Sequence, residues 1–142
     1  LLAVTVADCV PVYLLDPGAR AVALLHAGWR GTAAGILPRG IALFGQTWGT
    51  DPGDLLVHLG PAICGECYEV GPEVFGALGL EAPPDPAPVD VRAALARQAR
   101  TAGVPTESIT VSDACTLCGD NNLFSHRAGR SERQVAVVGI RP

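Results

Sequence analysis

The chain has 142 residues, of which 49% are hydrophobic and 17% are charged, and its formal net charge is −4. This length suits one domain with a substantial core, and this composition excludes a disordered chain. The negative charge argues against general binding to nucleic acid or to a membrane surface, and no apolar run approaches the ~20 residues of a membrane span.

The whole chain, residues 1–142, is therefore predicted to form a single domain. Its five cysteines are an odd number, which does not suggest a secreted disulfide framework, so we expect reduced thiols and a cytoplasmic location. The chain begins at Leu1 inside a strand-like run and without a methionine, so we also expect that an N-terminal portion is missing.

Hydrophobic patterning and turn residues predict an α+β fold. The expected strands are 1–7 (buried), 10–15, 20–25, 55–59, 108–111 and 134–140; the expected helices are 32–48 with Thr32 as cap and a kink or break at Pro38, 72–78, and 90–102. Two long loops, 60–71 and 115–130, are dense in polar residues and glycine, and loops of this kind often carry functional residues.

The strands expected over 10–15 and 20–25 flank Asp16-Pro17-Gly18-Ala19, which is a strong turn signal. They are therefore predicted to form an antiparallel hairpin. A two-residue or four-residue loop centred on the Pro17–Gly18 bond places Cys9 directly opposite His26. Opposite residues have Cβ atoms only ~5 Å apart, a spacing that suits two ligands of one metal ion or a thiol–imidazole pair. An inert buried thiol beside a hydrogen-bonded histidine is the alternative for this pair.

The segment from His26 to Gly31 joins a strand to a helix-like segment. Turns at Gly28 and Gly31 would bring the backbone close to a ligand. Trp29 offers a flat apolar face, and Arg30 offers a fork of donors for a carboxylate or phosphate. An ordinary strand end with Trp29 in the core is the alternative.

Two Cys-x-x-Cys pairs, Cys64/Cys67 and Cys115/Cys118, leave three possibilities open: a structural zinc site, a redox or disulfide pair, and ordinary thiols. In the second loop, His126, Arg127 and Arg130 suit either an anion site or a solvated surface. His58 lies inside an apolar strand, where a histidine is normally part of the core.

Four segments carry a family resemblance that covers the chain from end to end. They are Ala7-Asp8-Cys9-Val10-Pro11-Val12, His26 to Gly31, Gly60 to Gly71, and Leu123 to Arg127 with Gly129-Arg130. In this order the chain closely resembles the YfiH-like, laccase-domain family, long labelled multicopper polyphenol oxidoreductase. The resemblance implies a four-layer α/β/β/α sandwich with mixed sheets, similar to that of putative cysteine hydrolases.

The resemblance also implies a zinc ion held by one cysteine and two histidines. Cys9 and His26 match two of these ligands, and the other histidine lies upstream of the residues present here. Copper is the less favoured metal, since copper oxidases need several histidines and this chain has three.

The implied activity is that of a purine nucleoside phosphorylase with adenosine deaminase activity, acting on adenosine, inosine, guanosine and methylthioadenosine. Its partners would be a purine nucleoside and phosphate, in a monomer or homodimer. We assign Asp8, Cys9, His26 and Arg30 to catalysis, and Gly28, Trp29, Gly31, Tyr68 and Arg127 to substrate binding. Alternatives are a cysteine hydrolase or peptidoglycan-precursor editing enzyme with Cys9 as nucleophile and His26 as base, and the copper polyphenol oxidoreductase of the family label. A small zinc-stabilised interaction domain is the non-enzymatic alternative.

Overall fold

The computed structural model describes residues 1–119 and 122–141. The elements in chain order are β1 (Leu2–Val6), β2 (Val10–Asp16), β3 (Ala21–Ala27), α1 (Trp29–Ala33), α2 (Ile36–Trp48), the 3-10 turn η1 (Pro52–Asp54), β4 (Leu56–Leu59), β5 (Glu69–Val70), α3 (Pro72–Ala77), β6 (Ala87–Pro88), α4 (Val91–Thr101), the 3-10 turn η2 (Thr106–Ser108), β7 (Ile109–Val111) and β8 (Gln134–Val138).

The predicted α+β class is confirmed, and each predicted strand and helix has a counterpart. The two-residue strands β5 and β6 were not expected. No described helix is both long and apolar enough to span a membrane.

A mixed four-stranded sheet forms the centre of the molecule, in the order β3-β2-β4-β7. Its neighbouring strands are antiparallel except for β4 and β7, which are parallel. The chain ends contribute an antiparallel two-stranded ribbon, β1 with β8, and β5 pairs with β6 in a second small ribbon. The parallel β4–β7 pair matters for function because it starts the two long loops side by side.

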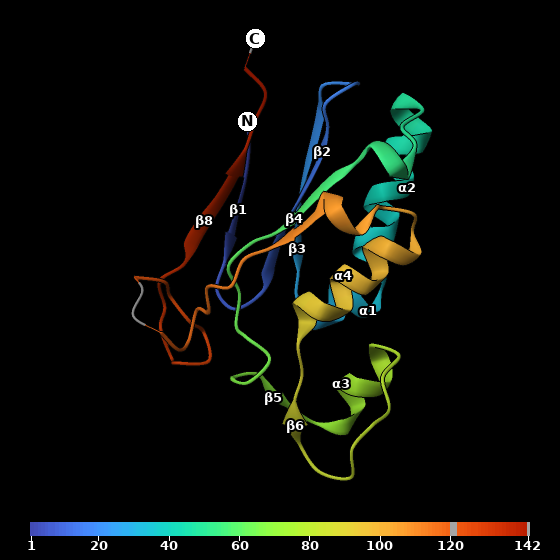
Figure 1. Cartoon of the computed structure of the whole chain (residues 1–142). Helices are drawn as coiled ribbons and strands as arrows, with labels where there is room; N and C mark the ends of the chain where they lie inside the picture. The colour runs from blue at the N-terminus through green and yellow to red at the C-terminus, as the bar shows by residue number, and fades with distance from the viewer. Residues whose placement is uncertain (120–121, 142) are drawn as a thin grey trace.

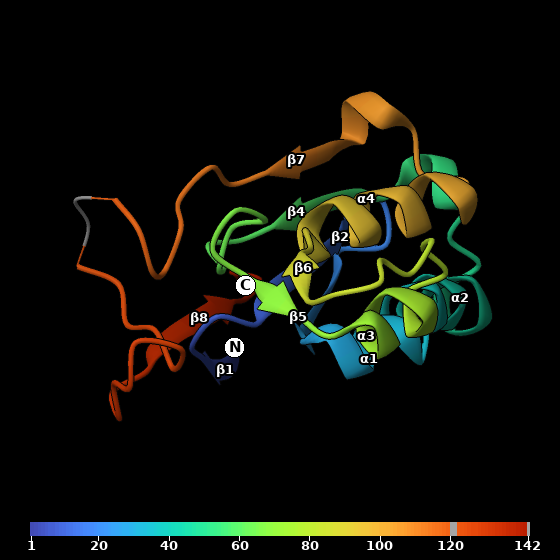
Figure 2. The ribbon, with the colours of Figure 1, turned by 90° about the horizontal axis from the view of Figure 1, so that it is seen from below.

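The described elements lie in three layers (Figures 1 and 2). Helices α2 and α4 cover one face of the central sheet, and the β1–β8 ribbon lies on the sheet's other side. This gives the order helix, sheet, ribbon. The second helix layer of the predicted α/β/β/α sandwich is not supplied by the described residues.

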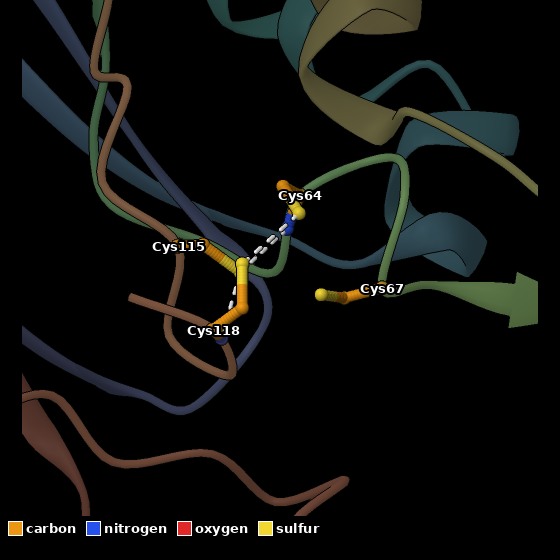
Figure 3. A group of neighbouring side chains, drawn as sticks. All are labelled: Cys64, Cys67, Cys115 and Cys118. Atoms are coloured by element: carbon orange, nitrogen blue, oxygen red, sulfur yellow. Dashed lines mark hydrogen bonds between the residues drawn. The ribbon is translucent and has the colours of Figure 1, made fainter. Parts of the chain in front are cut away.

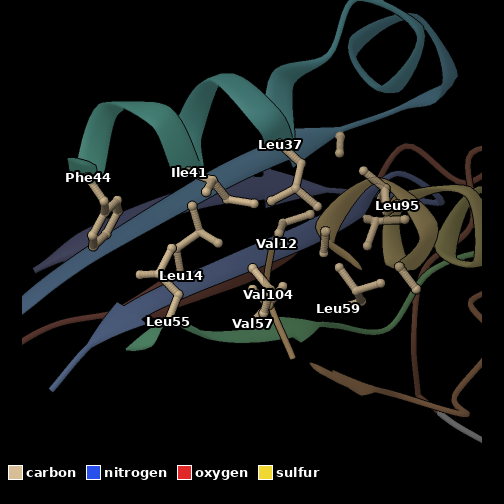
Figure 4. Packing of buried hydrophobic residues seen from close by; sticks show 14 of the residues in the cluster. Val12, Leu14, Leu37, Ile41, Phe44, Leu55, Val57, Leu59, Leu95 and Val104 are labelled. Atoms are coloured by element: carbon tan, nitrogen blue, oxygen red, sulfur yellow. The ribbon is translucent and has the colours of Figure 1, made fainter. Parts of the chain in front are cut away.

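The main core fills the space between the central sheet and helices α2 and α4 (Figure 4). Alternate residues of β2 point into it, as a period of two requires, and α2 answers with one apolar stripe. The labelled members of this cluster are Val12, Leu14, Leu37, Ile41, Phe44, Leu55, Val57, Leu59, Leu95 and Val104. Gly40 lets α2 pack closely on β2 and β3, because a Cβ there would lie 3.0 Å from Leu25 and 3.1 Å from Leu14.

The long helix predicted over 32–48 is in fact two helices. The break falls at Gly35, whose φ of 73° suits glycine, and α2 starts directly after it. Pro38 lies in the first turn of α2, where its missing N–H costs nothing, so the predicted kink at Pro38 is wrong. Thr32 is not a cap; it lies within α1 and its hydroxyl donates to the carbonyl of Gly28 (2.9 Å).

The prediction that residues 1–7 form a buried strand is right about the strand and wrong about its burial. In the β1–β8 ribbon only Val6 and Ala136 are fully buried. Leu2, Val135 and Val137 remain 43%, 58% and 49% exposed. The register places Val137 opposite Ala3 and Val135 opposite Thr5, so these four residues share one exposed face of the ribbon.

The predicted hairpin exists, but its register is shifted from the predicted one. Asp16 pairs with Ala21 and Pro11 pairs with His26, so the loop is 17–20 and its centre is one residue further along. Asp16 and Pro17 occupy the first two positions of a turn in which the Asp16 carboxylate accepts from the N–H of Ala19 (2.9 Å). Arg20, with a φ of 50°, is one more loop residue before the strand resumes. Cys9 therefore lies opposite Gly28 and not opposite His26.

Arg92 connects α4 to the chain segment that follows β7. Although it is a charged residue, it is buried, and its guanidinium Nη1 donates to the carbonyls of Ser112 (2.5 Å) and Ala114 (3.0 Å). Hydrogen bonds from a charged donor are stronger than neutral ones, so this residue fixes the start of the second long loop.

We predict that Arg92→Met lowers the free energy of unfolding by about 2 kcal/mol, because the half-buried carbonyls of Ser112 and Ala114 lose the charged donor of a buried side chain. Arg100→Met is the matched control: it lies on the same helix, is exposed, and is expected to change stability by less than ~0.5 kcal/mol. Denaturant unfolding of both variants measures this. Equal stability of the two variants would contradict the role given to Arg92.

Candidate active site

A small crevice lies where β2 and β3 meet the first long loop. Its walls are Asp8, Cys9, Ala27, Gly28, Trp29, Ile63, Tyr68 and Val91. Five of the residues that the sequence assigned to catalysis or substrate binding are therefore brought together at one place. Apolar walls with a few polar groups are typical of a small-molecule site, although the crevice encloses only about 30 Å³ in this structure, less than a nucleoside occupies.

Asp8 is held firmly from three directions. Its Oδ1 accepts from the Thr116 hydroxyl (2.6 Å), its Oδ2 accepts from the backbone N–H of Arg127 (2.8 Å), and its carbonyl accepts from Ile63 N–H (3.1 Å). Its φ of 77° is a left-handed conformation, which costs a non-glycine residue energy but which aspartate tolerates better than most. Backbone strain that is held by surrounding bonds is typical of functional sites.

Cys9 follows Asp8 and is half-buried in the crevice. A Cβ on Gly28 would lie 2.8 Å from the Cys9 sulfur, so only glycine leaves room for the thiol there. Gly28 itself has an extended backbone (φ −82°, ψ 179°) that any residue can adopt. The turn predicted at Gly28 is absent, and the glycine is needed for close approach alone. Burial first, and then the negative charge of Asp8, raise the pKa of the Cys9 thiol.

His26 is exposed near the end of β3, and it is not among the residues that line the crevice. His26 precedes Gly28 by two residues, and residues two apart lie on the same side of a strand. The His26 side chain therefore lies on the side of β3 on which Gly28 faces Cys9. Within the described residues, Cys9 and His26 belong to no group of three potential metal ligands. Thiol and imidazole are nevertheless the donor types that zinc prefers.

Two arginines lie on the aromatic rings of the site. The Arg30 guanidinium carbon is 4.5 Å from the ring centre of Trp29, and that of Arg127 is 5.0 Å from the ring centre of Tyr68. Arg127 also donates to the carbonyl of Glu69 (2.9 Å). Burial and Cys9 raise the pKa of Tyr68, while Arg127 and Arg30 oppose this effect, so the phenol stays protonated at neutral pH. Two cations beside one aromatic crevice suit an anionic or π-rich ligand.

Gly31 lies inside α1 and does not line the crevice, so the turn predicted at this residue is wrong. A Cβ there would lie 3.6 Å from the His26 carbonyl, an ordinary contact. Of the second-loop residues, His126 and Arg130 are exposed. His58 bonds the Thr110 hydroxyl through Nδ1 (2.8 Å), and its ring centre lies 5.7 Å from that of Tyr13. It is a hydrogen-bonded histidine in β4, as the structural interpretation expects, but it is only half-buried and not part of the core.

Sequence reasoning missed Thr116 and Ile63, which hold Asp8 in place. Thr116 is buried directly after Cys115, in the second Cys-x-x-Cys pair, and nothing in its neighbourhood signals contact with Asp8 across 108 residues. The two long loops are joined by the backbone bridge between Ala62 and Cys115, and no sequence pattern indicates this contact.

That bridge also brings together the two Cys-x-x-Cys pairs (Figure 3). The four-cysteine cluster consists of Cys64, Cys67, Cys115 and Cys118, and its sulfur atoms all lie within 4.8 Å of one another. The Cys115 sulfur accepts from the backbone N–H of Cys64 (3.2 Å), Leu117 (3.4 Å) and Cys118 (3.4 Å). Burial raises the pKa of Cys115, but these hydrogen bonds outweigh burial and lower it to about 6.

Comparison with known proteins assigns the chain to one family. The family model described as multi-copper polyphenol oxidoreductase laccase matches residues 1–141. The chain belongs to this family, as its motifs predicted.

Relatives carry more specific names. The purine nucleoside phosphorylase YlmD of Geobacillus stearothermophilus is 40% identical over 154 residues, covering 99% of this chain and 56% of the relative. The adenosine deaminase RL5 from an unknown prokaryotic organism is 36% identical over 89% of this chain and 52% of its own length. The crystal structure of YlmD from Geobacillus stearothermophilus superposes with a TM-score of 0.93 at 38% identity, covering 99% of this chain and 57% of that one. The chain thus spans about half the length of these relatives.

We predict that Gly28→Ala destabilises the protein by about 1–3 kcal/mol, because the new methyl group and the Cys9 sulfur cannot both fit. Gly76→Ala in α3 is the matched control; its Cβ would meet nothing within 4 Å, and alanine favours a helix by about 0.5–1 kcal/mol. Thermal unfolding of the two variants should therefore shift in opposite directions. A Gly28→Ala protein as stable as the parent would show that the thiol is not held against this glycine.

Proposed function

We propose that the chain forms part of a purine nucleoside phosphorylase that also deaminates adenosine, with adenosine, inosine, guanosine and methylthioadenosine as substrates. The names of the relatives support this activity class. The observation that carries it is the convergence of Asp8, Cys9, Trp29 and Tyr68 on one crevice, flanked by Arg30 and Arg127.

The base of the nucleoside would lie against the aromatic faces of Trp29 and Tyr68. Both rings are partly buried. Stacking of a base on such a ring is worth ~1–3 kcal/mol and does not depend on which base it is, because every base has a flat π-face. A guanidinium group lies over one face of each ring. This arrangement favours a flat, electron-rich ligand.

The phosphate would be held by Arg30 and Arg127. A guanidinium offers two parallel N–H donors to a phosphate, and both groups lie close enough to Tyr68 to influence its pKa. Gly28 lines the crevice on this side, and Gly31 follows it within α1. Positioning the anion beside the ribose is the main requirement of phosphorolysis, because the attacking oxygen must be aligned with the bond that breaks.

Asp8 would carry the proton in each reaction. Its carboxylate accepts bonds from Thr116 and from the backbone of Arg127, so its position is fixed before the substrate arrives. A proton carrier of this kind contributes typically 10²–10⁴-fold to a rate.

Cys9 and His26 would supply two ligands to a catalytic zinc ion, with copper as the less favoured metal. The donor types fit zinc, and the third ligand would be the upstream histidine that the family resemblance implies. When bound, such an ion provides a polarised water for attack on the adenine ring. This chain's part is to hold the thiol against Gly28 and the imidazole on the neighbouring strand.

The second helix layer of the four-layer sandwich would come from the half of the relatives that this chain does not span. The exposed ribbon face, formed by Ala3, Thr5, Val135 and Val137, is the surface on which it would pack. We further propose a cytoplasmic protein with reduced thiols that acts as a monomer or homodimer.

The test uses the chain extended by its upstream segment and supplied with adenosine or inosine, with and without phosphate. We expect free purine base only when phosphate is present, and inosine from adenosine in both conditions. Asp8→Asn should lower both rates by ~10²-fold or more, and Cys9→Ala should abolish them. Asp85→Asn, an exposed residue of the same charge, should leave both rates unchanged.

No turnover under any condition would overturn the purine proposal. Rapid alkylation of Cys9 with turnover of another substrate would favour a cysteine hydrolase instead. Undiminished activity of Asp8→Asn would remove Asp8 from the mechanism and leave the activity itself in place.

A further inference from the structure

The four-cysteine cluster lies outside the crevice, since none of its members lines it. Two of its cysteines come from the loop between β4 and β5, and two come from the segment after β7 (Figure 3). The crevice chemistry proposed above uses none of these thiols. A group of four thiols from two loops therefore needs its own explanation.

The sulfur positions match the demands of a tetrahedral ion. Four sulfurs at ~2.3 Å from one zinc ion lie about 3.8 Å from one another. The sulfurs of Cys64 and Cys118 are 3.8 Å apart, and all pairs are within 4.8 Å. The labelled side chains in Figure 3 point toward a common space. A disulfide would need one pair at ~2.05 Å, and none of the five cysteines forms a disulfide in this structure.

The backbone around the cluster is arranged for thiolate ligands. Three N–H groups point at the Cys115 sulfur, and hydrogen bonds of this kind favour the charged form of the sulfur. In the other loop, the N–H groups of Cys67 and Tyr68 both donate to the carbonyl of Cys64 (3.1 Å each), which forms the tight turn that brings its two cysteines to one side. Such outer contacts orient metal ligands.

The framework that carries the cluster is stiff. Ala62 and Cys115 form a backbone bridge, Thr116 N–H donates to the Ala62 carbonyl (3.1 Å), and Arg92 holds the Ala114 carbonyl. An open cavity beside the cluster is lined by the carboxylates of Glu66, Asp90 and Asp113, which attract a cation from solvent.

We propose that the four-cysteine cluster is a structural zinc site that fastens the two long loops together. Each thiol that is protonated releases its proton to solvent when the ion binds, and the closed four-thiolate shell leaves no position for a substrate. The site adjoins the crevice through sequence neighbours: Tyr68 follows Cys67, and Thr116 follows Cys115. Bound zinc would thus fix the aromatic wall and the hydroxyl that holds Asp8. This inference stands independently of the purine proposal.

The first test measures metal content and coordination in the 142-residue chain, purified without chelator from zinc-supplemented cells. We expect about one zinc ion per chain, and X-ray absorption should give four sulfur neighbours at ~2.3 Å. Cobalt(II) in place of zinc should show the intense visible bands of a tetrahedral four-thiolate ion. Cys9→Ala, which removes the one thiol outside the cluster, should retain both results.

The second test is Cys118→Ser, which changes the exposed member of the cluster and disturbs packing least. Zinc affinity should fall at least tenfold, and chelation should lower the melting temperature of the parent protein but not that of this variant. If Cys118→Ser folds poorly, the cobalt spectrum and X-ray absorption still test the proposal, because both are measured on the parent protein. A mixed nitrogen–sulfur shell, iron in place of zinc, an internal disulfide in the isolated protein, or four freely reactive cluster thiols would each overturn it.

Discussion

The arrangement of the site depends on the carboxylate of Asp8. One residue in a left-handed conformation accepts hydrogen bonds from Thr116 and Arg127 in the second long loop, and from Ile63 in the first. Because Cys9 comes next in the chain, the same residue that gathers the loops also directs the thiol toward Gly28. The two bonds from the second loop use separate carboxylate oxygens, so a side chain without two acceptor atoms would leave one of these donors without its present partner. The first loop is joined to the same residue through the Asp8 carbonyl.

The two long loops reach Asp8 because of the central sheet. The parallel β4–β7 pair starts both loops at the same edge, and the bridge between Ala62 and Cys115 continues this pairing beyond the strands. Arg92 adds a buried charged donor from the helix layer. The four cysteines lie at the point where the loops diverge again, so a zinc ion there would act where the backbone pairing ends. The site is accordingly supported on both sides, by the sheet and by the cluster.

Much of the fold could be predicted from the sequence because local signals sufficed. Apolar runs bounded by turn residues located the strands, and the helix predicted over 90–102 is α4, for which Asp90 proves to be the N-cap. The hairpin register failed because a turn that starts with Asp-Pro needs an extra left-handed residue, Arg20, before pairing resumes. The burial of β1 failed because residue type alone does not say which elements cover a strand. For the site, the motifs predicted five of the residues that line the crevice, but His26 and Gly31 do not line it. The parts played by Ile63 and Thr116, and the joining of the four cysteines, depend on contacts between distant loops.

The most direct measurement is a crystal structure of the upstream-extended protein with a nucleoside analogue whose glycosidic bond is carbon–carbon, together with phosphate. We predict that the base lies against Trp29 and Tyr68, the ribose beside Asp8 and Cys9, and the phosphate between Arg30 and Arg127. An analogue bound elsewhere, or a crevice that stays closed to it at saturating concentration, would contradict the claim that this crevice is where a purine nucleoside reacts.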